Sequence, residues 1–195
     1  MNLRRAGVII INKVDTAALH DVETVRNNIH KTNPQAQVIE TACRVNASQP
    51  ERIRGKRVLV VEDGPTLTHG EMAYGAGVVA ARQYGASQLV DARPFAVGSI
   101  RGTYAKYTHL TTLLPAMGYS AAQRHELEET INRVPCDLVL VATPIDLGSI
   151  LQLNKPSVRV RYEIEERSGK GLRPILSEFT GRFEHRLEAV SGTAL

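Results

Sequence analysis

Two short polar stretches follow apolar runs and carry residue types suited to ligand binding. The first, Asn12-Lys13-Val14-Asp15, comes directly after the run Val8–Ile11. An aspartate at this spacing can accept two parallel hydrogen bonds from the N1–H and exocyclic amine of guanine, a donor pair that adenine lacks on that edge. The spacing therefore indicates a base-reading loop, with Asp15 as acceptor, Lys13 packing on the base plane and Asn12 binding a ring acceptor. The alternative is a helix cap, in which Asp15 or Thr16 caps the next helix and Asn12 holds a turn.

A second stretch supports the base-reading interpretation. The sequence "IETACRV" places Thr41, Ala42 and Cys43 after the next short apolar segment, Val38-Ile39. In a nucleotide-binding α/β domain, the backbone of a loop at this position contacts the base oxygen. We therefore include Thr41 and Ala42 in the predicted base site.

The stretch "EDGPTLTHGEM" follows another apolar run, Val58–Val61, and predicts an anion site. Glycines free the backbone here, and a helix after the loop would point its N-terminal amides at a bound anion. Threonine hydroxyls and a histidine add donors. A purely structural turn is the alternative, and Glu62 and Asp63 are weak candidates for magnesium ligands or loop caps. The predicted anion or phosphate ligands are Gly64, Thr66, Thr68, His69 and Gly70, joined by Arg93 and Arg101 with Lys106 from the segment that follows.

A third loop, "ATPIDL", places Pro144 at a predicted helix start, where its missing amide has no cost. Asp146 in this loop is interpreted first as a helix cap and second as a ligand-binding group. A phosphate-binding G-x-x-x-x-G-K-[ST] sequence is absent from these 195 residues. Without that loop and its lysine, no segment here is expected to hold the β- and γ-phosphates of a nucleotide. We therefore expect weak nucleotide binding and no competent GTPase in this chain alone, and we assign no catalytic residue.

Charge, aromatic content and hydropathy argue against a nucleic-acid-binding protein, a membrane-spanning protein and a secreted protein. The net charge is +4, the basic residues are scattered, and aromatic residues make up 5% of the chain, so no nucleic-acid surface is predicted. No apolar run approaches the roughly 20 residues that span a bilayer, and no signal-peptide cleavage site follows the N-terminus. Cys43 and Cys136 match no metal-binding spacing and are expected to be free thiols in a cytoplasmic protein.

Hydrophobic periodicity predicts alternating strands and helices. Continuous apolar runs at Val8–Ile11, Val58–Val61 and Leu138–Val141 indicate strands buried on both faces. Alternation over Ser157–Glu165 indicates a half-exposed strand, which we place at a sheet edge. The fold class is α/β, a mostly parallel Rossmann-like sheet with helices on both faces, related to P-loop NTPases. Further expected elements are helices over 16–31, 71–84, 99–107, 120–134 and 172–179, short strands at 38–39, 88–91 and 94–97, and a polar connector over 44–56.

Three regions are predicted from these elements. Residues 1–45 would form the C-terminal part of a P-loop-NTPase-like nucleotide-binding unit. Residues 56–166 would form a Rossmann-like α/β domain, and residues 167–195 a C-terminal helix and tail. In parallel sheets ligands bind at the carboxyl ends of strands, so each strand-to-helix loop named above is a candidate site.

Longer stretches carry a resemblance to a known family. "INKVDTA", "IRGKRVLVVEDGPTLTHGEMAYGAG", "DARPFAVGSI", "LPAMGYS", "LEETINRVPCDLVLVATPIDL" and "NKPSVRVRYE" together resemble the cyclic 2,3-diphosphoglycerate synthetase family, which includes proteins described as predicted GTPases. The likeness runs from about Asn2 to Glu166. It covers only the C-terminal portion of the family, without the part that carries the P-loop.

The resemblance implies an NTP-dependent synthetase. Family synthetases use ATP with Mg²⁺ to close a phosphoanhydride within 2,3-bisphosphoglycerate, whereas the Asn-Lys-x-Asp spacing favours guanine. The implied cofactor is therefore ATP or GTP with Mg²⁺, and the implied ligands are a nucleotide and an acidic phosphorylated metabolite. An upstream P-loop polypeptide is a possible partner, a homo-oligomer is expected, and the location is cytoplasmic.

Two other functions stay open. The chain could be a non-catalytic, self-associating α/β module that uses the strand around Val158–Ile164. A weaker alternative is an enzyme of another type with His69 as acid or base.

Overall fold

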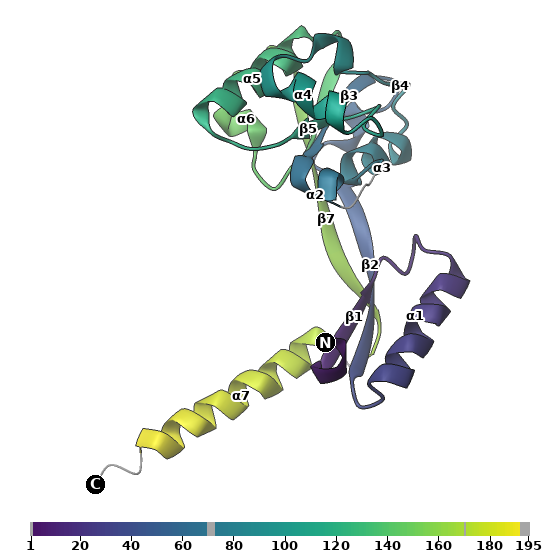
Figure 1. The fold of residues 1–195 in the computed structure, drawn as a ribbon, viewed down its shortest axis with the longest axis vertical. Helices are drawn as coiled ribbons and strands as arrows, with labels where there is room; N and C mark the ends of the chain where they lie inside the picture. Colours follow the sequence, from purple (N-terminus) through teal and green to yellow (C-terminus); the bar gives the residue numbers. More distant parts are fainter. Residues whose placement is uncertain (1, 70–72, 170, 192–195) are drawn as a thin grey trace. The chain divides into compact units, whose positions relative to one another are not determined.

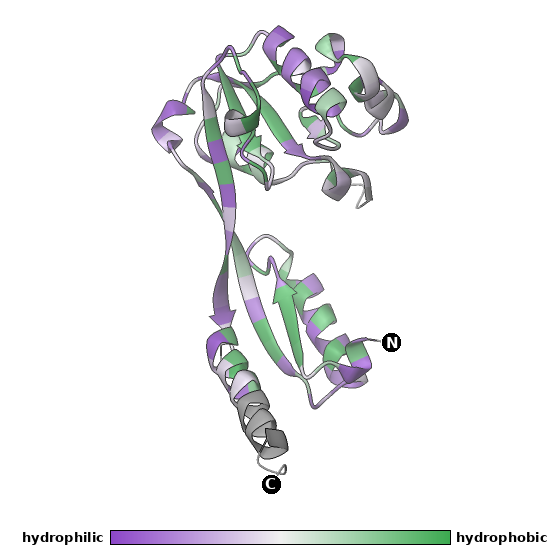
Figure 2. Ribbon diagram, turned by 90° about the vertical axis from the view of Figure 1, so that its left-hand side faces the viewer, coloured by the Kyte–Doolittle hydropathy of each residue, from purple (hydrophilic) through white to green (hydrophobic). Residues whose placement is uncertain are grey.

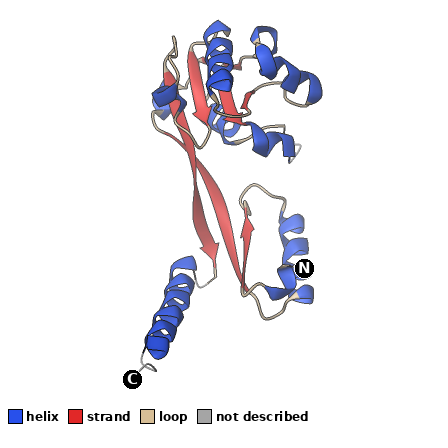
Figure 3. Ribbon diagram, turned by 60° about the vertical axis from the view of Figure 1, so that its left-hand side comes forward, coloured by secondary structure: helices blue, strands red, loops and turns tan. Residues whose placement is uncertain are grey.

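The computed structural model describes the backbone of residues 2–69, 73–169 and 171–191, and the side chains of these ranges except residues 69 and 182–191. The described chain forms an α/β fold with a mostly parallel, Rossmann-like sheet (Figure 1, Figure 3). It divides into two compact units: unit 1 is Met1–Arg44 with Ile164–Leu195, and unit 2 is Val45–Glu163.

Unit 1 is built on a single β-α-β turn. The apolar strand β1 (Val8–Asn12) leads into α1 (Leu19–Thr32), which returns to β2 (Gln37–Ala47), and β1 pairs with β2 in parallel. Val22 and Ile29 on α1 are buried with Ile11 of β1. The unit also contains the 3₁₀ turn η1 (Leu3–Arg5) and α7 (Leu172–Ser191), which follows β7 (Ser157–Ser168).

Unit 2 is centred on β3 (Arg57–Asp63), whose residues Val58–Val61 are all fully buried. Successive residues of a strand point to opposite faces, so both faces of the sheet are covered here. Four strand pairs of the unit are parallel: β3 pairs with β4 (Gln88–Leu89), β5 (Leu114–Ala116) and β6 (Leu138–Ala142), and β6 pairs with β7. The helical elements are η2 (Pro50–Arg52), α2 (Gly64–His69), α3 (Ala76–Gln83), η3 (Arg93–Phe95), α4 (Gly98–Lys106), α5 (Ala121–Arg133) and α6 (Leu147–Ile150).

Several local predictions are confirmed. The three apolar runs are strands, and the helix predicted over 120–134 is α5. A capping box begins this helix, in which the side chains of Ser120 and Gln123 each accept a hydrogen bond from the other's backbone amide. Asp146 caps α6 by accepting a hydrogen bond from the Gly148 amide at 3.1 Å. Cys43 and Cys136 are free thiols, and burial raises the pKa of the Cys136 thiol.

Other predictions are wrong. The segment 94–97 is no strand, because η3 and its flanking turn occupy it. The stretch after β3 begins as helix α2, and the next helix starts at Ala76 rather than at residue 71. The polar connector begins later than expected, because β2 continues to Ala47. The strand β5 was not predicted, because three residues are too short for a pattern to be detected.

The strand β7 is not at a sheet edge, since the strand order is β1-β2-β7-β6-β3-β4. The alternation of polar and apolar side chains in β7 indicates that one face of the sheet is exposed there. An edge strand is a different thing, because it lacks a hydrogen-bonded neighbouring strand on one side. Alternation therefore cannot distinguish an edge strand from an inner one. The hypothesis of association through Val158–Ile164 loses its structural basis.

Candidate functional site

The predicted base-reading residues of unit 1 lie together where β1 ends, because Asn12 is in register with Thr41. The loop predicted around Thr41 and Ala42 is wrong, since both residues lie inside β2, which continues to Ala47. The Asn12 carboxamide oxygen accepts hydrogen bonds from the Lys13 amide at 2.8 Å and from the Thr41 hydroxyl at 2.9 Å. Thr41 and Ala42 are fully buried, so this bond anchors the exposed loop to the interior of the unit. The Val14 amide also donates to the Thr41 carbonyl at 3.2 Å. Asn12 therefore joins the loop after β1 to strand β2, and its predicted contact with a ring acceptor of a base stays a prediction.

The loop turns sharply at Lys13, whose φ of 64° is the only positive value among the described non-glycine residues. This left-handed conformation costs roughly 1–2 kcal/mol for a residue with a side chain. The amides of Thr16 and Ala17 both donate to the Lys13 carbonyl, at 3.2 and 3.1 Å, and hold the turn. The Lys13 side chain is exposed and free to cover a bound base.

Asp15 is exposed, and its carboxylate lies beside the backbone of Cys43 in β2. One carboxylate oxygen lies 3.4 Å from the Cys43 amide nitrogen, which is long for a hydrogen bond. The carboxylate is therefore only weakly committed within the protein and is available to N–H donors of a ligand. The arrangement suits the acceptor role predicted for Asp15, and helix capping is not its role here, because α1 begins at Leu19 with Ala18 as its cap residue.

A second concentration of polar groups lies at the carboxyl edge of the unit 2 sheet. Glu62 of β3 is in register with Pro115 of β5 and with Ala142 of β6. The chain leaves β3 towards β4 and β5 on one side, and later returns to β6 on the other side. The space between β3 and β6 is thus a topological switch point, the place where open parallel sheets bind ligands.

Glu62 is the buried acid of this edge, with 4% of its surface exposed. One of its oxygens accepts hydrogen bonds from the amides of Gly77 at 2.8 Å and Val78 at 3.2 Å, in the first turn of α3. A Cβ on Gly75 would lie 2.4 Å from the other oxygen, and one on Gly77 would lie 2.5 Å from a Val60 methyl carbon. Glycine is required at both positions for the helix to approach the strand and its carboxylate.

Burial raises the pKa of Glu62 to about 7, although the amides of Val78, Gly77 and Gly75 lower it and the nearby Asp63 raises it further. The amides that would attract an anion at this helix N-terminus are therefore already used by the protein's own carboxyl group. A phosphate binding at α3 would have to displace Glu62.

The predicted anion loop is only partly available. Asp63 accepts a hydrogen bond from the Thr66 hydroxyl at 2.7 Å, and the Thr68 hydroxyl donates to the Pro65 carbonyl at 3.3 Å. A Cβ on Gly64 would lie 2.8 Å from the Ala116 carbonyl oxygen, so this glycine serves a close approach to β5. The His69 side chain and Gly70 lie outside the described residues, and their anion-binding role stays a prediction.

The predicted arginines have internal partners. The Arg93 guanidinium binds both carboxylate oxygens of Asp91, at 2.7–2.9 Å, which raises the pKa of Arg93 and lowers that of Asp91. Arg101 donates to the Ala96 carbonyl at 3.2 Å. A bound anion would compete with these contacts. Among the described side chains no group of three or more His, Cys, Asp or Glu residues is placed to hold a metal ion, so Glu62 and Asp63 would need ligands from elsewhere.

Two polar residues at the edge of unit 2 had no signal in the sequence. Thr143 follows β6, is 4% exposed, and donates its hydroxyl to the Ile145 carbonyl at 2.6 Å. The Tyr119 hydroxyl is buried, which raises its pKa, and it is near enough to Thr143 and Asp63 for both to affect that pKa, although it lacks the geometry of a hydrogen bond. Only the folded sheet brings these residues to Asp63.

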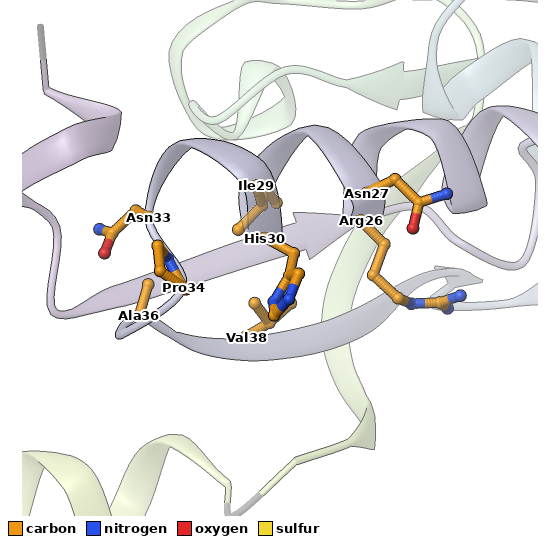
Figure 4. Close-up of a pocket in the computed structure, with 8 residues that line it drawn as sticks. All are labelled: Arg26, Asn27, Ile29, His30, Asn33, Pro34, Ala36 and Val38. Carbon is orange, nitrogen blue, oxygen red and sulfur yellow. The ribbon is translucent and has the colours of Figure 1, made fainter.

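A cavity of about 210 Å³ in unit 1 is separate from the base-reading loop (Figure 4). Its lining comes from the second half of α1, the following turn and the start of β2, including Arg26, His30 and Val38. These residues lie at the amino ends of the parallel strands, whereas Asn12 and Asp15 lie at the carboxyl ends. The cavity therefore plays no part in the site proposed below.

Fold and site together define a two-unit α/β protein with candidate ligand loops at the carboxyl edges of parallel strands. No protein-family model matches the chain. It is 56% identical over 183 residues to arginine synthetase ArcE of Thermococcus kodakarensis, a match that covers 94% of this chain and 41% of the relative. The chain thus spans about two fifths of the length of this relative. The match supports the coarse expectation of a synthetase-related protein and leaves the P-loop relation untested. None of the described helices has the length and apolar character to cross a membrane.

Proposed function

We propose that this chain forms the base-reading and second-substrate part of a nucleotide-dependent synthetase, and that the phosphate-binding loop comes from outside residues 1–195. The observation that carries the proposal is the link between the loop after β1 and strand β2. Asn12 is bonded to buried Thr41, and Asp15 is exposed with one long contact, 3.4 Å from the Cys43 amide nitrogen. This geometry supports the proposal because it leaves one carboxylate and one lysine side chain exposed beside each other.

The nucleotide in this proposal is ATP or GTP with Mg²⁺. Two exposed residues fit the base: Asp15 would accept its N–H groups, and Lys13 would cover its plane. Ala42 is fully buried within β2, which does not favour the contact predicted for it. When bound, the nucleotide supplies the transferable phosphoryl group of a synthetase. The exposed carboxylate favours guanine, because adenine offers no matching pair of donors.

The second substrate is assigned to the carboxyl edge of unit 2. The family resemblance implies an acidic phosphorylated metabolite there, whereas the name of the relative indicates arginine. Asp63 at this edge favours a group rich in N–H donors, such as a guanidinium, over a phosphate, because a phosphate would need Mg²⁺ between the like charges. Glu62 is enclosed by α3 and is not offered to a ligand. We therefore propose an arginine-type substrate and keep 2,3-bisphosphoglycerate as the comparison.

Calorimetry tests both halves of the proposal. The chain alone, and the chain mixed with the part of the T. kodakarensis relative that it does not match, would be titrated with GTP, ATP, arginine and 2,3-bisphosphoglycerate, each with Mg²⁺. We expect weak nucleotide binding to the chain alone and at least tenfold tighter binding in the mixture. No heat with any nucleotide in either sample would overturn the proposal.

The second candidate is a non-catalytic, self-associating module. The observation in its favour is β1, which ends the strand order with one edge unpaired among the described residues. Light scattering distinguishes the candidates, because a stable homo-oligomer without nucleotide binding supports the module alone.

A further inference from the structure

The strand ends of unit 2 bring three loops together at the carboxyl edge of its sheet. The strands are largely hydrophobic (Figure 2), so polar groups gather where the strands end. Asp63 ends β3, which pairs with β5 on one side and with β6 on the other. Tyr119 lies in the loop after β5, and Thr143 directly follows β6. A Cβ on Gly64 would clash with the Met117 sulfur, so the chain after β3 is in contact with the loop after β5.

The Tyr119 hydroxyl is a polar group at this edge whose hydrogen bonding is incomplete. Its oxygen is buried and has no hydrogen-bond partner among the described residues, although the ring as a whole is only half-buried. Burial raises the pKa of this phenol and Asp63 raises it further, while Thr143 lowers it, so the hydroxyl keeps its proton. A buried hydroxyl without a partner costs free energy, and a ligand that pairs with it would remove this cost.

The neighbouring Thr143 sets the direction of the missing hydrogen bonds. Its hydroxyl donates to the Ile145 carbonyl at 2.6 Å, so its oxygen can only accept a further hydrogen bond. The Tyr119 proton can therefore go to Thr143, which leaves the lone pairs of the phenol oxygen for an N–H donor. Asp63 is also an acceptor, and its carboxylate already accepts from the Thr66 hydroxyl at 2.7 Å. This set of acceptors suits a cation with several N–H groups.

The turn that carries Thr143 is fixed by contacts from β7. Arg159 donates to the Pro144 carbonyl at 2.8 Å and forms an ion pair with Asp146 at 3.1 Å. Ile145, between these two contacts, keeps 38% of its surface exposed. The turn thus holds an apolar side chain at the surface next to Thr143, where the aliphatic part of a ligand can pack.

We propose that Tyr119 is a specificity-determining residue for the second substrate, and that its phenol oxygen accepts one N–H of the guanidinium group that Asp63 binds. The inference rests on the proposed function and adds a residue and a hydrogen-bond direction to that site. A guanidinium presents five N–H donors in a planar fork, so acceptors from two different loops can bind it at once, whereas an ammonium is a compact charge without this geometry. The pair therefore favours arginine over lysine. Because the phenol oxygen is covered in the free chain, the ring must turn about its side-chain torsions when the ligand binds.

The test is calorimetry with L-arginine and with L-lysine. The full chain would be titrated alone and mixed with the part of the T. kodakarensis relative that it does not match. Tyr119→Phe removes only the hydroxyl, and it should weaken arginine binding about tenfold while lysine binding changes little. Since the hydroxyl has no partner among the described residues, the denaturant midpoint of this variant should equal or exceed that of the natural chain.

Tyr104→Phe is the matched control. The Tyr104 hydroxyl is also buried, but it donates to the Leu113 carbonyl at 2.7 Å. Its removal leaves that carbonyl unpaired, so the denaturant midpoint should fall while arginine binding stays unchanged. The two tyrosine variants are therefore expected to differ in both measurements, and a purely structural role of Tyr119 would make them alike.

The outcomes separate this inference from the proposed function. Unchanged arginine affinity of Tyr119→Phe would overturn the inference and leave the proposed substrate standing, with an ordered water as the partner of the hydroxyl. A lowered midpoint with equal loss of arginine and lysine affinity would also overturn it, because the hydroxyl would then be structural. If the natural chain binds no arginine in either sample, the proposed second substrate is itself rejected and the role of Tyr119 is rejected with it.

Discussion

The central strands of the two units differ in how completely they are paired and covered. In unit 2, β3 has neighbours on both sides and both faces covered, and its central residues are fully buried. In unit 1, β1 pairs with β2 and has no second neighbour among the described residues, and Ile10 is 44% exposed on a strand of the same apolar character. A continuous apolar strand is typical of a strand covered on both faces. Within unit 1, β1 is covered by α1 on one face, while Ile10 on the other face is largely exposed.

The difference extends to the polar groups. Glu62 in unit 2 is enclosed by α3, and hydrogen bonds from two amides of that helix fix its carboxylate. Asp15 in unit 1 has a single long contact, at 3.4 Å. The carboxylate of Glu62 is thus fixed by contacts within the chain, whereas that of Asp15 is only weakly held. The predictions below probe this contrast, from the largest expected effect to the smallest.

The largest effect is expected where unit 2 is most tightly packed. Gly77→Ala adds a Cβ 2.5 Å from a Val60 methyl carbon and 3.0 Å from the Ala142 Cβ. Overpacking of this kind should lower the free energy of unfolding by about 3 kcal/mol. Chemical denaturation measures it. Gly102→Ala is the matched control, because no atom lies within 4 Å of its added Cβ in α4, and it should stabilise by up to about 1 kcal/mol. Equal effects of the two substitutions would contradict the packing argument.

The second prediction concerns pH. The pKa of Glu62 rises from its ordinary value of 4.5 to about 7 in the folded chain. Between these values the folded state binds more protons than the unfolded state, so stability falls as pH rises from about 4.5 to 7 and is level above. After discounting for partial solvation the loss should be about 2 kcal/mol.

Glu62→Gln removes this titration, and the slope of stability against pH should flatten. Hydrogen exchange at the Gly77 and Val78 amides, followed from pH 5 to 8 and corrected for intrinsic rates, reports it within unit 2. A slope that survives in the variant would assign the titration to another group.

The third prediction addresses the open site of unit 1. Asp15→Asn replaces one acceptor by a donor and should weaken GTP binding at least tenfold, about 1.4 kcal/mol, while ATP binding stays unchanged. The measurement is calorimetry on the chain mixed with the unmatched part of the relative. Asp21→Asn, an exposed carboxylate on α1, is the control for loss of charge. Equal loss of GTP and ATP affinity would speak against base reading by Asp15.

The smallest effect is expected at the turn of the same loop. Lys13→Gly relieves the left-handed backbone at φ 64° and should stabilise unit 1 by about 0.5 kcal/mol. Hydrogen exchange at the Val14 amide, which donates to the Thr41 carbonyl, is the local measurement. Lys13→Ala keeps the Cβ and should give no gain. Stabilisation by both substitutions would mean that the side chain, not the backbone, is strained.

The local sequence predicted where the strands lie in the chain better than it predicted which strands pair with each other. The runs at Val58 and Leu138 are strands because continuous apolar sequence needs cover on both faces. The placement of β7 was missed, since pairing in the plane of a sheet leaves no mark on the alternation of its side chains. The end of β2 was missed because its residues 44–47 are partly exposed and polar in part.

The candidate site divides in the same way. Asn12, Asp15 and Thr41 were predicted from spacing, because a strand end and its loop are contiguous in the chain. The burial of Glu62 was not predicted, since it depends on α3 returning over β3. Tyr119 and Thr143 come to Asp63 from separate loops, and no local pattern could have found them.

The boundaries between the units fall inside two strands, after Arg44 in β2 and before Ile164 in β7. Arg44 and Glu165 form an ion pair across this junction in unit 1, while Ser48 and Arg159 exchange hydrogen bonds in unit 2. Closing a free loop of about 120 residues would cost roughly 4 kcal/mol in chain entropy. Once unit 2 has folded, the two segments of unit 1 are already held near each other, so the entropy of closing this loop need not be lost again. The smaller unit is thus expected to be more stable in the intact chain than as two separate segments that must first find each other.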